Sequence, residues 1–429
     1  MKNGILQRSL SVAFVGTALG AGAPGAWASG FQIQEQSGSG LGTGFAGEAA
    51  AVHDASTAFW NPAGQTLLPG RQAAAALSLI RPRNEFRDNG TSTFRALGNG
   101  GEGGENAVVP AIYGTWALDS RWSVGLAFNA PFGLATEWDN TWAGQFHAVR
   151  SESKTLNINP TVAYRLSDRL SLGGGISYQR LEATLTNRAV LAPPFPATAI
   201  GLGRVEGDDW GWGFNLGALF TLGTQTRIGI TYRSEIDYEV KGDLSFEGFP
   251  AAVPGRGVRA DIKLPQVLSL GVSHQFSPKI RLLADWSWTG WDAIQDLRVV
   301  DAATGATISD TRLGFDNSWR AGVGVEYGMN RSWLLRGGLV YDTTPVQDAY
   351  RTPRLPDENR IWLALGARYQ PAADASWWID FGYAHIFIDD ASSNLPFAGA
   401  SAAEAQRGAL RGSYEASVDI LAVQVGFRF

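Results

Sequence analysis

Few residues in this 429-residue chain have the types and spacing that chemistry requires. There is no cysteine, so thiolate chemistry and disulfides are excluded, and a metal site would have to use imidazoles and carboxylates. The four histidines are scattered without the spacing of metal ligands: His53, His147, His274 and His385. We therefore expect no metal and no cofactor, and we interpret the histidines as isolated polar or structural residues. The adjacent His53 and Asp54 suit a hydrogen-bonded hinge.

Two other chemical patterns lack the context they need. Gly42, Gly44 and Gly47 form a GxGxxG string, but no strand precedes it and no acidic residue in a βαβ context follows it. It is interpreted as a flexible small-residue segment. No motif marks an activated serine or aspartate, although triads are assembled in space and a lipid hydrolase stays an alternative. Our expectation is that the protein is not an enzyme.

The end of the chain indicates which elements position its side chains. Every second residue from Leu421 to Phe429 is apolar, so a strand here has one apolar face and one polar face. A terminal strand of this kind, ending in an aromatic residue, is typical of the closing strand of an outer-membrane β-barrel. We expect it to pair with the first strand.

The N-terminal residues indicate export, which an outer-membrane barrel requires. Lys2 and Arg8 precede an apolar stretch from Leu10 to Ala21, and an A-x-A cleavage signal ends at Ala28. Residues 1–28 are therefore predicted to be a signal peptide, with the mature chain beginning near Ser29. The predicted location is the bacterial outer membrane, as a multi-pass β-barrel.

Composition agrees with this class. The mean hydropathy of −0.08 is no higher than that of a soluble protein, because alternating strands hide a lipid-facing surface from hydropathy averages. Removal of residues 1–28, which carry two basic and no acidic residues, changes the net charge from −5 to −7. That balance argues against nucleic acid as a partner.

Alternating segments recur along the mature chain. In one of them Leu282, Trp286 and Trp288 share a face opposite Arg281 and Asp285, and charges beside an apolar face favour a polar lumen over a buried core. About 14 such segments occur, an even number as bacterial barrels require. The fold class predicted is all-β: a 14-stranded antiparallel transmembrane β-barrel formed by residues 71–429.

The connections between these segments fall into two length classes. Tight turns are expected at 118–121, 167–169, 223–225, 277–279 and 328–332. Long loops are expected at 83–106, 131–152, 187–209, 242–257, 299–315, 343–358 and 389–412. Short turns are typical of the periplasmic side and long loops of the extracellular side. A secreted β-sandwich, the alternative for alternating strands, would not sort its loops in this way.

Residues 29–70 do not follow the strand pattern. They are rich in Gly, Ala and Ser, with helical potential around 47–52, and they precede a first strand that starts near Arg71. A barrel of about 14 strands leaves a lumen that a compact segment can fill. We interpret residues 29–70 as a plug inside the lumen and call them the hatch.

At the hatch the sequence becomes recognisable. Residues 29–64, SGFQIQEQSGSGLGTGFAGEAAAVHDASTAFWNPAG, resemble the N-terminal hatch of the FadL/TodX (OmpP1) family of outer-membrane transporters of hydrophobic compounds, including its Asn61-Pro62-Ala63 motif. Further matching stretches are PFGLATEW (131–138), TYRSEI (231–236), LPQ (264–266), WSWTGWDAIQDLR (286–298) and PDENRIW (356–362). The resemblance covers essentially the whole mature chain.

The resemblance implies passive uptake of long-chain fatty acids. In that scheme an extracellular groove captures the ligand, the hatch gates its passage, and it leaves sideways through an opening in the barrel wall. By the same resemblance, Phe31 contacts ligand and Arg298 lies near the head group. A second basic position falls on either Arg180 or Arg188. Phe132 and Gly133 match the inward kink beside the lateral opening, close to Asn61-Pro62-Ala63.

Two features of the residues themselves bear on this scheme. Pro131 falls where the third strand should continue, and proline followed closely by glycine weakens a strand, so either a kink or the end of the strand at Ala130 is expected. Two loop segments are unusually apolar and suit either an outer groove or mere packing between loops. Their groove candidates are Phe195, Ile200, Leu202, Phe246 and Phe249.

The cargo stays open at this point. A fatty acid needs a cation in the pocket to offset the cost of taking its carboxylate out of water, whereas an aromatic or alkane hydrocarbon does not. Uptake of hydrocarbons by the same route is the alternative, and a general porin is a further one that the plug argues against. The partners expected are a hydrophobic small molecule, outer-membrane lipid and lipopolysaccharide, with the protein a monomer.

Overall fold

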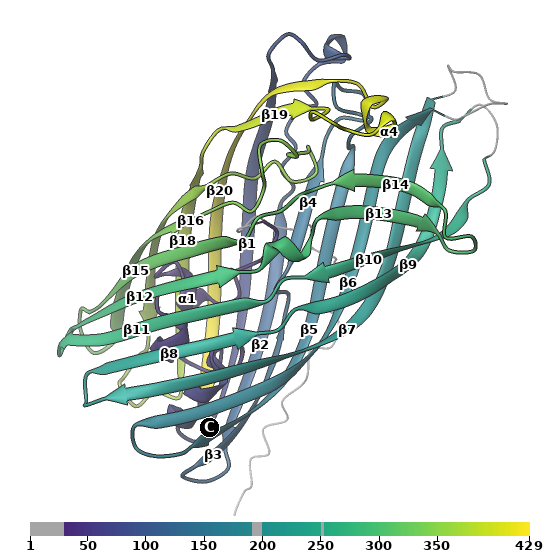
Figure 1. The fold of residues 1–429 in the computed structure, drawn as a ribbon. Coiled ribbons are helices and arrows are strands. Elements are labelled where there is room, and N and C mark those ends of the chain that lie inside the picture. The colour runs from purple at the N-terminus through teal and green to yellow at the C-terminus, as the bar shows by residue number, and fades with distance from the viewer. Residues whose placement is uncertain (1–29, 191–199, 250–252) are drawn as a thin grey trace, which may run out of the picture.

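The computed structural model describes residues 30–190, 200–249 and 253–429, and strands dominate them (Figure 1). Twenty strand segments form one continuous sheet in the described residues. They are β1 (Arg71–Asp88), β2 (Ala107–Ala117), β3 (Trp122–Asn129), β4 (Gly133–Glu137), β5 (Arg150–Arg165), β6 (Leu170–Val190), β7 (Ile200–Leu222), β8 (Thr226–Arg233), β9 (Ile236–Glu247), β10 (Arg256–Leu264), β11 (Val267–Ser277), β12 (Ile280–Thr289), β13 (Asp296–Asp301), β14 (Thr307–Arg312), β15 (Ser318–Gly328), β16 (Trp333–Asp342), β17 (Arg360–Tyr369), β18 (Trp377–Ile388), β19 (Ala391–Leu395) and β20 (Leu410–Arg428).

Six pairs of these segments are single strands with a short interruption. For example, β3 and β4 both pair with β5, and β18 and β19 both pair with β20. The other four pairs are β8 with β9, β10 with β11, β12 with β13, and β14 with β15. The twenty segments therefore make fourteen antiparallel strands, which confirms the predicted barrel.

The barrel closes between its first and last strands, as predicted. The ladder between β1 and β20 runs from Gln72 opposite Arg428 to Asp88 opposite Gly412. Leu421, Val423 and Phe427 of β20 are exposed on the outer face, whereas Gln424 between them is fully buried toward the hatch. The alternation of the terminal strand thus separates lipid from lumen.

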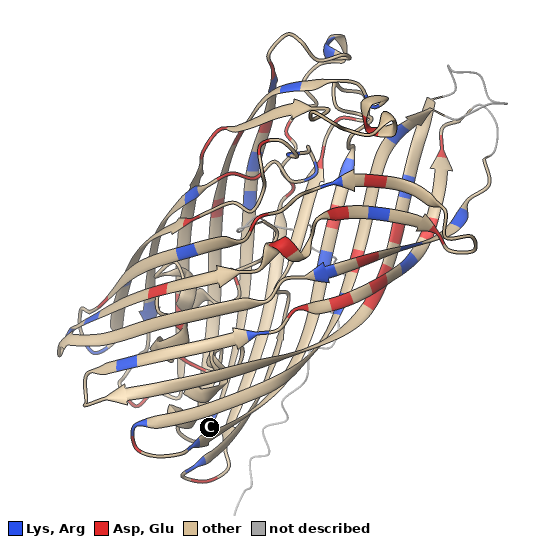
Figure 2. Cartoon of the chain, in the orientation of Figure 1, with Lys and Arg blue, Asp and Glu red and all other residues tan. Residues whose placement is uncertain are grey.

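The outer face of β7 marks the upper limit of the apolar surface. Its outward residues are exposed and apolar or aromatic from Leu222 up to Trp210, and the next outward residues are Asp208, Glu206 and Arg204. Figure 2 shows charges collecting on the same upper part of the wall, over β7, β9, β10 and β13, while the lower outer wall is largely uncharged. Aromatic residues followed by charges are typical of a membrane interface.

The strands continue beyond this interface, so several predicted loops are shorter than expected. β1 reaches Asp88, and β6 and β7 extend to Val190 and from Ile200, inside segments predicted as loops. The apolar alternation stops where the wall leaves the membrane, although the backbone ladder does not. The loop between β13 and β14 is shorter for the same reason. The five predicted tight turns do separate neighbouring strands, and they lie at the end of the barrel that holds the C-terminus.

The described part of the hatch lies inside the barrel and folds as short helical turns. These are α1 (Gly38–Leu41), α2 (Glu48–Ala51), α3 (Thr57–Trp60) and η1 (Pro62–Leu67); outside the hatch are η2 (Arg95–Leu97), η3 (Trp291–Ala293) and α4 (Ala402–Ala405). The predicted helical potential around 47–52 corresponds to α2. Gly229 and Gly338 of the wall have no space for a Cβ, because the backbones of Ala49 and Thr43 lie against them. Small residues on both sides therefore let the hatch pack directly on the wall.

No helix in the described residues is long and apolar enough to cross a membrane. The predicted signal peptide and its cleavage site lie outside the described residues.

Candidate functional site

The third barrel strand is broken at residues 130–132, which we call the kink. β3 ends at Asn129 and β4 begins at Gly133, and both pair with β5, so the strand continues past Pro131 instead of ending at Ala130. Because proline has no N–H to donate, the ladder is interrupted there. The side chain of Thr155 bridges the break: its Oγ1 accepts from the N–H of Phe132 at 2.9 Å.

The kink leaves a gap in the wall between β2 and the third strand. Their ladder runs from Ala117 opposite Ser123 to Ile112 opposite Phe128, and the next described contact between the two sides of the gap is the bridge from Gly104 to Thr136. Between these points the described ladder holds no pair joining β2 to the third strand. Backbone groups lining the gap need other partners.

The start of the hatch supplies those partners. Residues 31–36, which we call the N-terminal seal, run beside the kink. The N–H of Ile33 donates to the Pro131 carbonyl at 2.8 Å, and the N–H of Gly133 donates to the Phe31 carbonyl at 2.9 Å. Gln36 completes the contact, because its Nε2 donates to the Ala130 carbonyl at 2.7 Å and its Oε1 accepts from the Ala130 N–H at 3.3 Å. The seal therefore replaces a missing neighbouring strand.

Four aromatic rings pack around the seal. The ring of Trp291 lies 4.8 Å from Phe31 and 6.1 Å from both Phe132 and Phe315, measured between centroids. Trp291 is fully buried and fills the space beside Gly30, where a Cβ would collide with its indole. Gly30 is held further by Asp357, whose carboxylate accepts from its N–H at 3.1 Å. The rings of Phe31 and Phe132 lie between two cavities, one lined by Phe31 and the other by Phe132.

The larger cavity, which we call the apolar pocket, lies on the extracellular side of this aromatic cluster. The space inside it, including the part open to solvent, is about 880 Å³. Most of its lining is apolar and comes from the hatch, the wall and the loop between β16 and β17: Phe31, Leu134, Leu181, Leu185, Ile262, Leu264, Ile294, Leu297, Leu313, Phe315 and Leu355. Such a lining suits the apolar part of a ligand.

One cation in this lining has no acidic partner among the described residues. Arg354 donates to Ser151 Oγ at 2.9 Å and to Asn187 Oδ1 at 3.3 Å, both neutral acceptors. Burial, with a smaller contribution from the charge of Arg407, lowers the pKa of Arg354 to about 9, so the guanidinium is still charged at neutral pH. A partly buried guanidinium without a counter-ion is a natural partner for a carboxylate.

The basic residues expected near the head group lie elsewhere. Arg298 alternates with the pocket residue Leu297 on β13, so it points away from the pocket; it is 58% exposed and pairs with Asp310 at 2.9 Å. Arg180 pairs with Glu182 and Asp208 on the outer wall. Arg188, the remaining candidate, lies at the far end of β6, where its backbone N–H donates to the Gln145 carbonyl. The structure brings none of the three into the apolar pocket.

The predicted groove residues divide between two faces. Phe246 and Phe249 lie together, with 5.8 Å between their rings, and Phe246 packs against an apolar cluster of Leu244, Val258 and Val299. Phe249 covers Gly201, so the neighbouring Ile200 and Leu202 point to the opposite side of β7. Phe195 lies outside the described residues. A smaller cavity lined by Val258 and Val299 shares Ile262 and Leu297 with the apolar pocket, so an apolar inner surface connects this cluster to it.

The Asn61-Pro62-Ala63 turn packs on the wall at a different place from the kink. Asn61 is fully buried, and its Nδ2 donates to the carbonyls of Ala49 at 2.6 Å and Ala218 at 3.1 Å. Its Oδ1 accepts from the N–H of Ala63 and starts η1. The turn lies against Gly173 of β6 and Gly217 of β7. The hatch residues that contact the kink are those of the seal.

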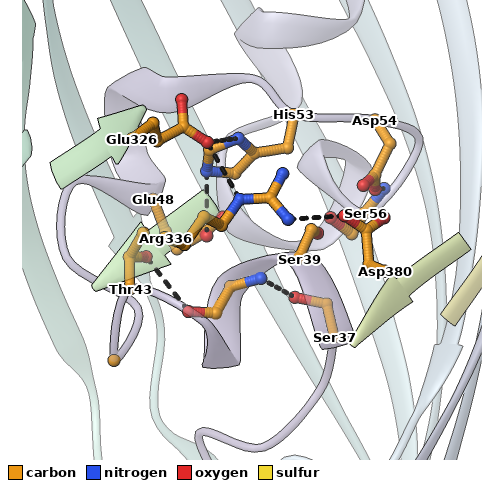
Figure 3. A network of polar contacts seen from close by, with 12 residues as sticks. Ser37, Ser39, Thr43, Glu48, His53, Asp54, Ser56, Glu326, Arg336 and Asp380 are labelled. Atoms are coloured by element: carbon orange, nitrogen blue, oxygen red, sulfur yellow. Dashed lines mark hydrogen bonds and ion pairs between the residues drawn. The ribbon is translucent and has the colours of Figure 1, made fainter. Parts of the chain in front are cut away.

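The opposite side of the hatch is attached to the wall by charges (Figure 3). Arg336 donates to Glu326 at 2.9 Å and to Asp380 at 2.5 Å, and all three side chains are buried. Two hatch residues join this network. His53 lies 3.4 Å from Glu326, and Asp54 pairs at 3.0 Å with Arg368, which also pairs with Asp380.

The hatch histidine and its neighbouring acids do not form the expected hinge. His53 and Asp54 contact different wall residues instead of each other, because successive side chains diverge. Glu48 lies 3.5 Å from His53, and burial raises the pKa of Glu48 to about 8, with a further contribution from Asp54. Burial also lowers the pKa of His53 to about 4, so it is neutral at pH 7. We call the hatch residues Glu48, His53 and Asp54, together with the wall residues Glu326, Arg336, Arg368 and Asp380, the ionic anchor.

No group of three or more metal-ligating side chains occurs in the described part of the chain. The other histidines contact single neighbours: His147 the Gly408 carbonyl, His274 the Thr226 hydroxyl and His385 the Asp419 carboxylate, each at 2.9 Å.

Sequence reasoning did not single out Gln36, Trp291, Arg354 or Asp357. Trp291 and Asp357 lie within WSWTGWDAIQDLR and PDENRIW, two stretches that carried the family resemblance. The resemblance therefore marked these stretches, but it assigned no role to either residue. Arg354 precedes the second stretch by two residues. Nothing in the spacing of Gln36 indicated that it would complete the wall at the kink.

Fourteen antiparallel strands, a lumen filled by the N-terminal segment and an apolar pocket beside a break in the wall define a plugged outer-membrane transport barrel. Residues 19–429 match the family model described as "Outer membrane protein transport protein (OMPP1/FadL/TodX)". The chain belongs to this family, is located in the outer membrane and is not an enzyme.

Individual relatives agree with this membership. The chain is 28% identical over 386 residues to a "Long-chain fatty acid transport protein" of Salmonella typhi, covering 84% of this chain and 88% of that protein. A Pseudomonas aeruginosa FadL homologue has the same fold, with a TM-score of 0.85 at 24% identity over 93% of this chain and all of that one. The Pseudomonas putida toluene transporter TodX shares it with a TM-score of 0.69 at 16% identity, over 94% of this chain and all of that one.

Proposed function

We propose that this protein takes up long-chain fatty acids passively across the outer membrane. The observation that carries the proposal is Arg354, a cation without an acidic partner among the described residues, in a pocket whose lining is mostly apolar. A hydrocarbon chain gains by leaving water for such a lining, and its carboxylate needs a partner of opposite charge when it does so. The name of the Salmonella typhi relative supports the same cargo.

The route that we propose has three stages. The ligand is captured on the apolar inner surface near Phe246 and Phe249, and it then enters the apolar pocket with its carboxylate at Arg354. Movement of the N-terminal seal away from the kink would next uncover the gap between β2 and the third strand. The ligand would leave sideways through that gap, near Phe132 and Gly133, into the membrane.

The first experiment measures oleate and toluene binding to the detergent-refolded protein. Arg354→Gln is compared with the wild type, and Arg298→Gln serves as the matched control because its guanidinium already pairs with Asp310. A lost charge-assisted contact is worth about 1.5–3 kcal/mol, so we expect about 10- to 100-fold weaker oleate binding for Arg354→Gln alone. An equal loss in Arg298→Gln would return the head-group role to that residue.

Toluene separates this proposal from its alternative. Uptake of aromatic hydrocarbons is favoured by the pocket lining, and TodX, which shares the fold, is a toluene transporter by its title. Toluene carries no charge, so its binding should not respond to Arg354→Gln. Saturable toluene binding without oleate binding would make the protein a hydrocarbon carrier.

Deletion of residues 29–31 tests the gating step. It removes Phe31 from both the aromatic cluster and the hydrogen bond to Gly133 while leaving the ionic anchor intact. We expect impaired uptake by a folded barrel, and unchanged uptake would remove the gating role of the seal. We further propose that the protein works as a monomer among outer-membrane lipid and lipopolysaccharide, whose charges would face the charged upper wall seen in Figure 2.

A further inference from the structure

A second cavity lies on the other side of the aromatic cluster and holds a cation that the route above does not use. The space inside it, including the part open to solvent, is about 790 Å³, and the kink, the hatch and the wall line it. Phe132 lines this cavity, whereas Phe31 lines the apolar pocket, so the two cavities meet at the contact between these rings. We call it the inner cavity.

Arg233 is the cation of interest in the inner cavity. It lies at the end of β8, on the side of the strand that faces the hatch, as does Gly229. Its Nη1 donates to Ser177 Oγ and its Nη2 to the Phe59 carbonyl, both at 3.0 Å, and its Cζ lies 4.2 Å from the centre of the Phe59 ring. All of these partners are neutral.

The charge of Arg233 is therefore uncompensated within the described residues. No carboxylate of the described chain lies at ion-pair distance from it, whereas Arg320, the other arginine in the lining, pairs with Asp285 at 2.7 Å. A guanidinium has five N–H donors, and in Arg233 only Nη1 and Nη2 donate to a protein acceptor, each to a neutral one. Charged side chains removed from water normally have a partner of opposite charge, so this arrangement has room for an anion.

We propose that Arg233 forms a second carboxylate site, which receives the head group of a long-chain carboxylic acid after it has left Arg354. This inference rests on the proposed uptake of fatty acids. The acid would pass the contact between Phe31 and Phe132 and exchange one guanidinium for another. Its charge is then compensated at both ends of the step through a water-poor interior.

The rest of the inner cavity suits this ligand. Phe59, Trp60 and Phe132 offer apolar surface for the hydrocarbon chain. Two carboxyl groups also line the cavity, and neither opposes an anion strongly: Asp285 is paired with Arg320, and burial raises the pKa of Glu48 to about 8, so Glu48 is largely uncharged at pH 7. Pro131 in the lining places the site next to the gap in the wall.

A purely structural role is the competing explanation for Arg233. Its hydrogen bond to the Phe59 carbonyl also attaches the hatch to β8, and an attachment of this kind would affect the passage of every ligand alike. A carboxylate site affects only charged ligands. The comparison of a charged with an uncharged ligand of the same chain length therefore separates the two roles.

The experiment measures transport of oleate and of oleyl alcohol by the protein in liposomes. Arg233→Gln keeps hydrogen-bond donors and removes the charge, Arg233→Lys keeps the charge, and Arg227→Gln is the control on the same strand and face, six residues away and outside the lining. We expect Arg233→Gln to slow oleate about tenfold relative to oleyl alcohol, in line with a lost charged hydrogen bond. Arg233→Lys should restore most of the rate, and Arg227→Gln should not change it.

Equal slowing of both ligands, or of neither, would overturn the second site. Failure of the proposed function would give a different result: the wild type would not bind oleate, or Arg354→Gln would bind it as tightly as the wild type does. If Arg233→Gln does not refold, a crystal structure of the wild type with a bromine-labelled fatty acid tests the second site instead. Bromine density beside Trp60 would support the site, and density confined to the pocket beside Phe31 would overturn it.

Discussion

The two sides of the hatch are attached to the barrel by different forces. On the side of β15 to β20, the ionic anchor joins Asp54 and His53 to buried charges of the wall, with Arg336 between two carboxylates. On the side of the kink, the seal makes a few backbone hydrogen bonds, the contacts of Gln36 and aromatic packing. A buried ion pair is costly to break, whereas single hydrogen bonds open readily. The contrast teaches that the first residues of the hatch are held less strongly than the side that carries the ionic anchor.

The largest effect should come from breaking the anchor. Arg336→Met leaves Glu326 and Asp380 buried with one partner fewer, and such losses cost about 3–5 kcal/mol. We expect faster hydrogen exchange throughout α1 to η1. Arg312→Met is the control, since Arg312 and Asp296 are both exposed and such pairs contribute about 0–1 kcal/mol. Exchange of the hatch that stays as slow as in the wild type would show that packing alone holds it.

A smaller effect is expected from weakening the seal. Gln36→Ala removes the side-chain partners of both backbone groups of Ala130, and unpaired buried groups cost about 1–3 kcal/mol. Faster exchange should be confined to the seal and the kink, with the amides of α2 unchanged, and uptake should not fall. Gln34→Ala is the neighbouring control. If α2 also loosened, the two sides of the hatch would act as one unit.

The smallest effect is a pH dependence within the anchor. Burial raises the pKa of Glu48 from its ordinary 4.5 to about 8, so the docked hatch keeps a proton that the undocked hatch releases. That contribution is fully present below pH 4.5 and is lost as pH rises toward 8.

From pH 7.5 to 8 the contribution of His53 is small, because its pKa is about 4 in the docked hatch and ordinarily 6.5, so it is almost entirely neutral in both states. Burial also raises the pKa of Glu35 in the seal to about 7, so the effect of Glu48 is the difference between the wild type and Glu48→Gln. The Glu48 contribution to the stability of docking should fall by at most about 1.4 kcal/mol per pH unit. The total should therefore fall less in Glu48→Gln than in the wild type, as measured by hydrogen exchange of residues 48–51. A parallel fall in both proteins would assign the effect to another group.

The architecture was predictable because alternation is a local property. The strands, their number and the closing pair between β1 and β20 follow from the sequence, since one face meets lipid and the other the lumen. The lengths of the loops were overestimated where that contrast ends. Above Trp210 the outward residues of β7 are Asp208, Glu206 and Arg204, so the outer face is no longer apolar although the backbone ladder continues.

The candidate site was predictable only in part. The kink at Pro131 follows from the residues themselves, but it was expected beside Asn61-Pro62-Ala63, and the structure places Phe31 there instead, joined to residues 131–133 by backbone hydrogen bonds and ring contact. Arg354, the cation that we propose for the head group, was not predictable. Arg298 lies in a recognisable stretch, yet the interruption between β12 and β13 decides which residues after it face inward, and Leu297 takes that place.

By itself, then, the sequence determined an outer-membrane barrel of fourteen strands with an N-terminal plug, and the family to which it belongs. The two-residue period of the strands, the composition and the motifs suffice for these three conclusions, because each is a property of residues that are close together in the chain. Only the tertiary structure decided that Arg354 and Arg233 face the two cavities. Arg354 reaches its pocket on a loop that is fixed across the barrel mouth by Arg351, which binds the Asp357 carbonyl and the Ser392 carbonyl. Contacts between residues this distant in the chain leave no periodic trace in a single sequence.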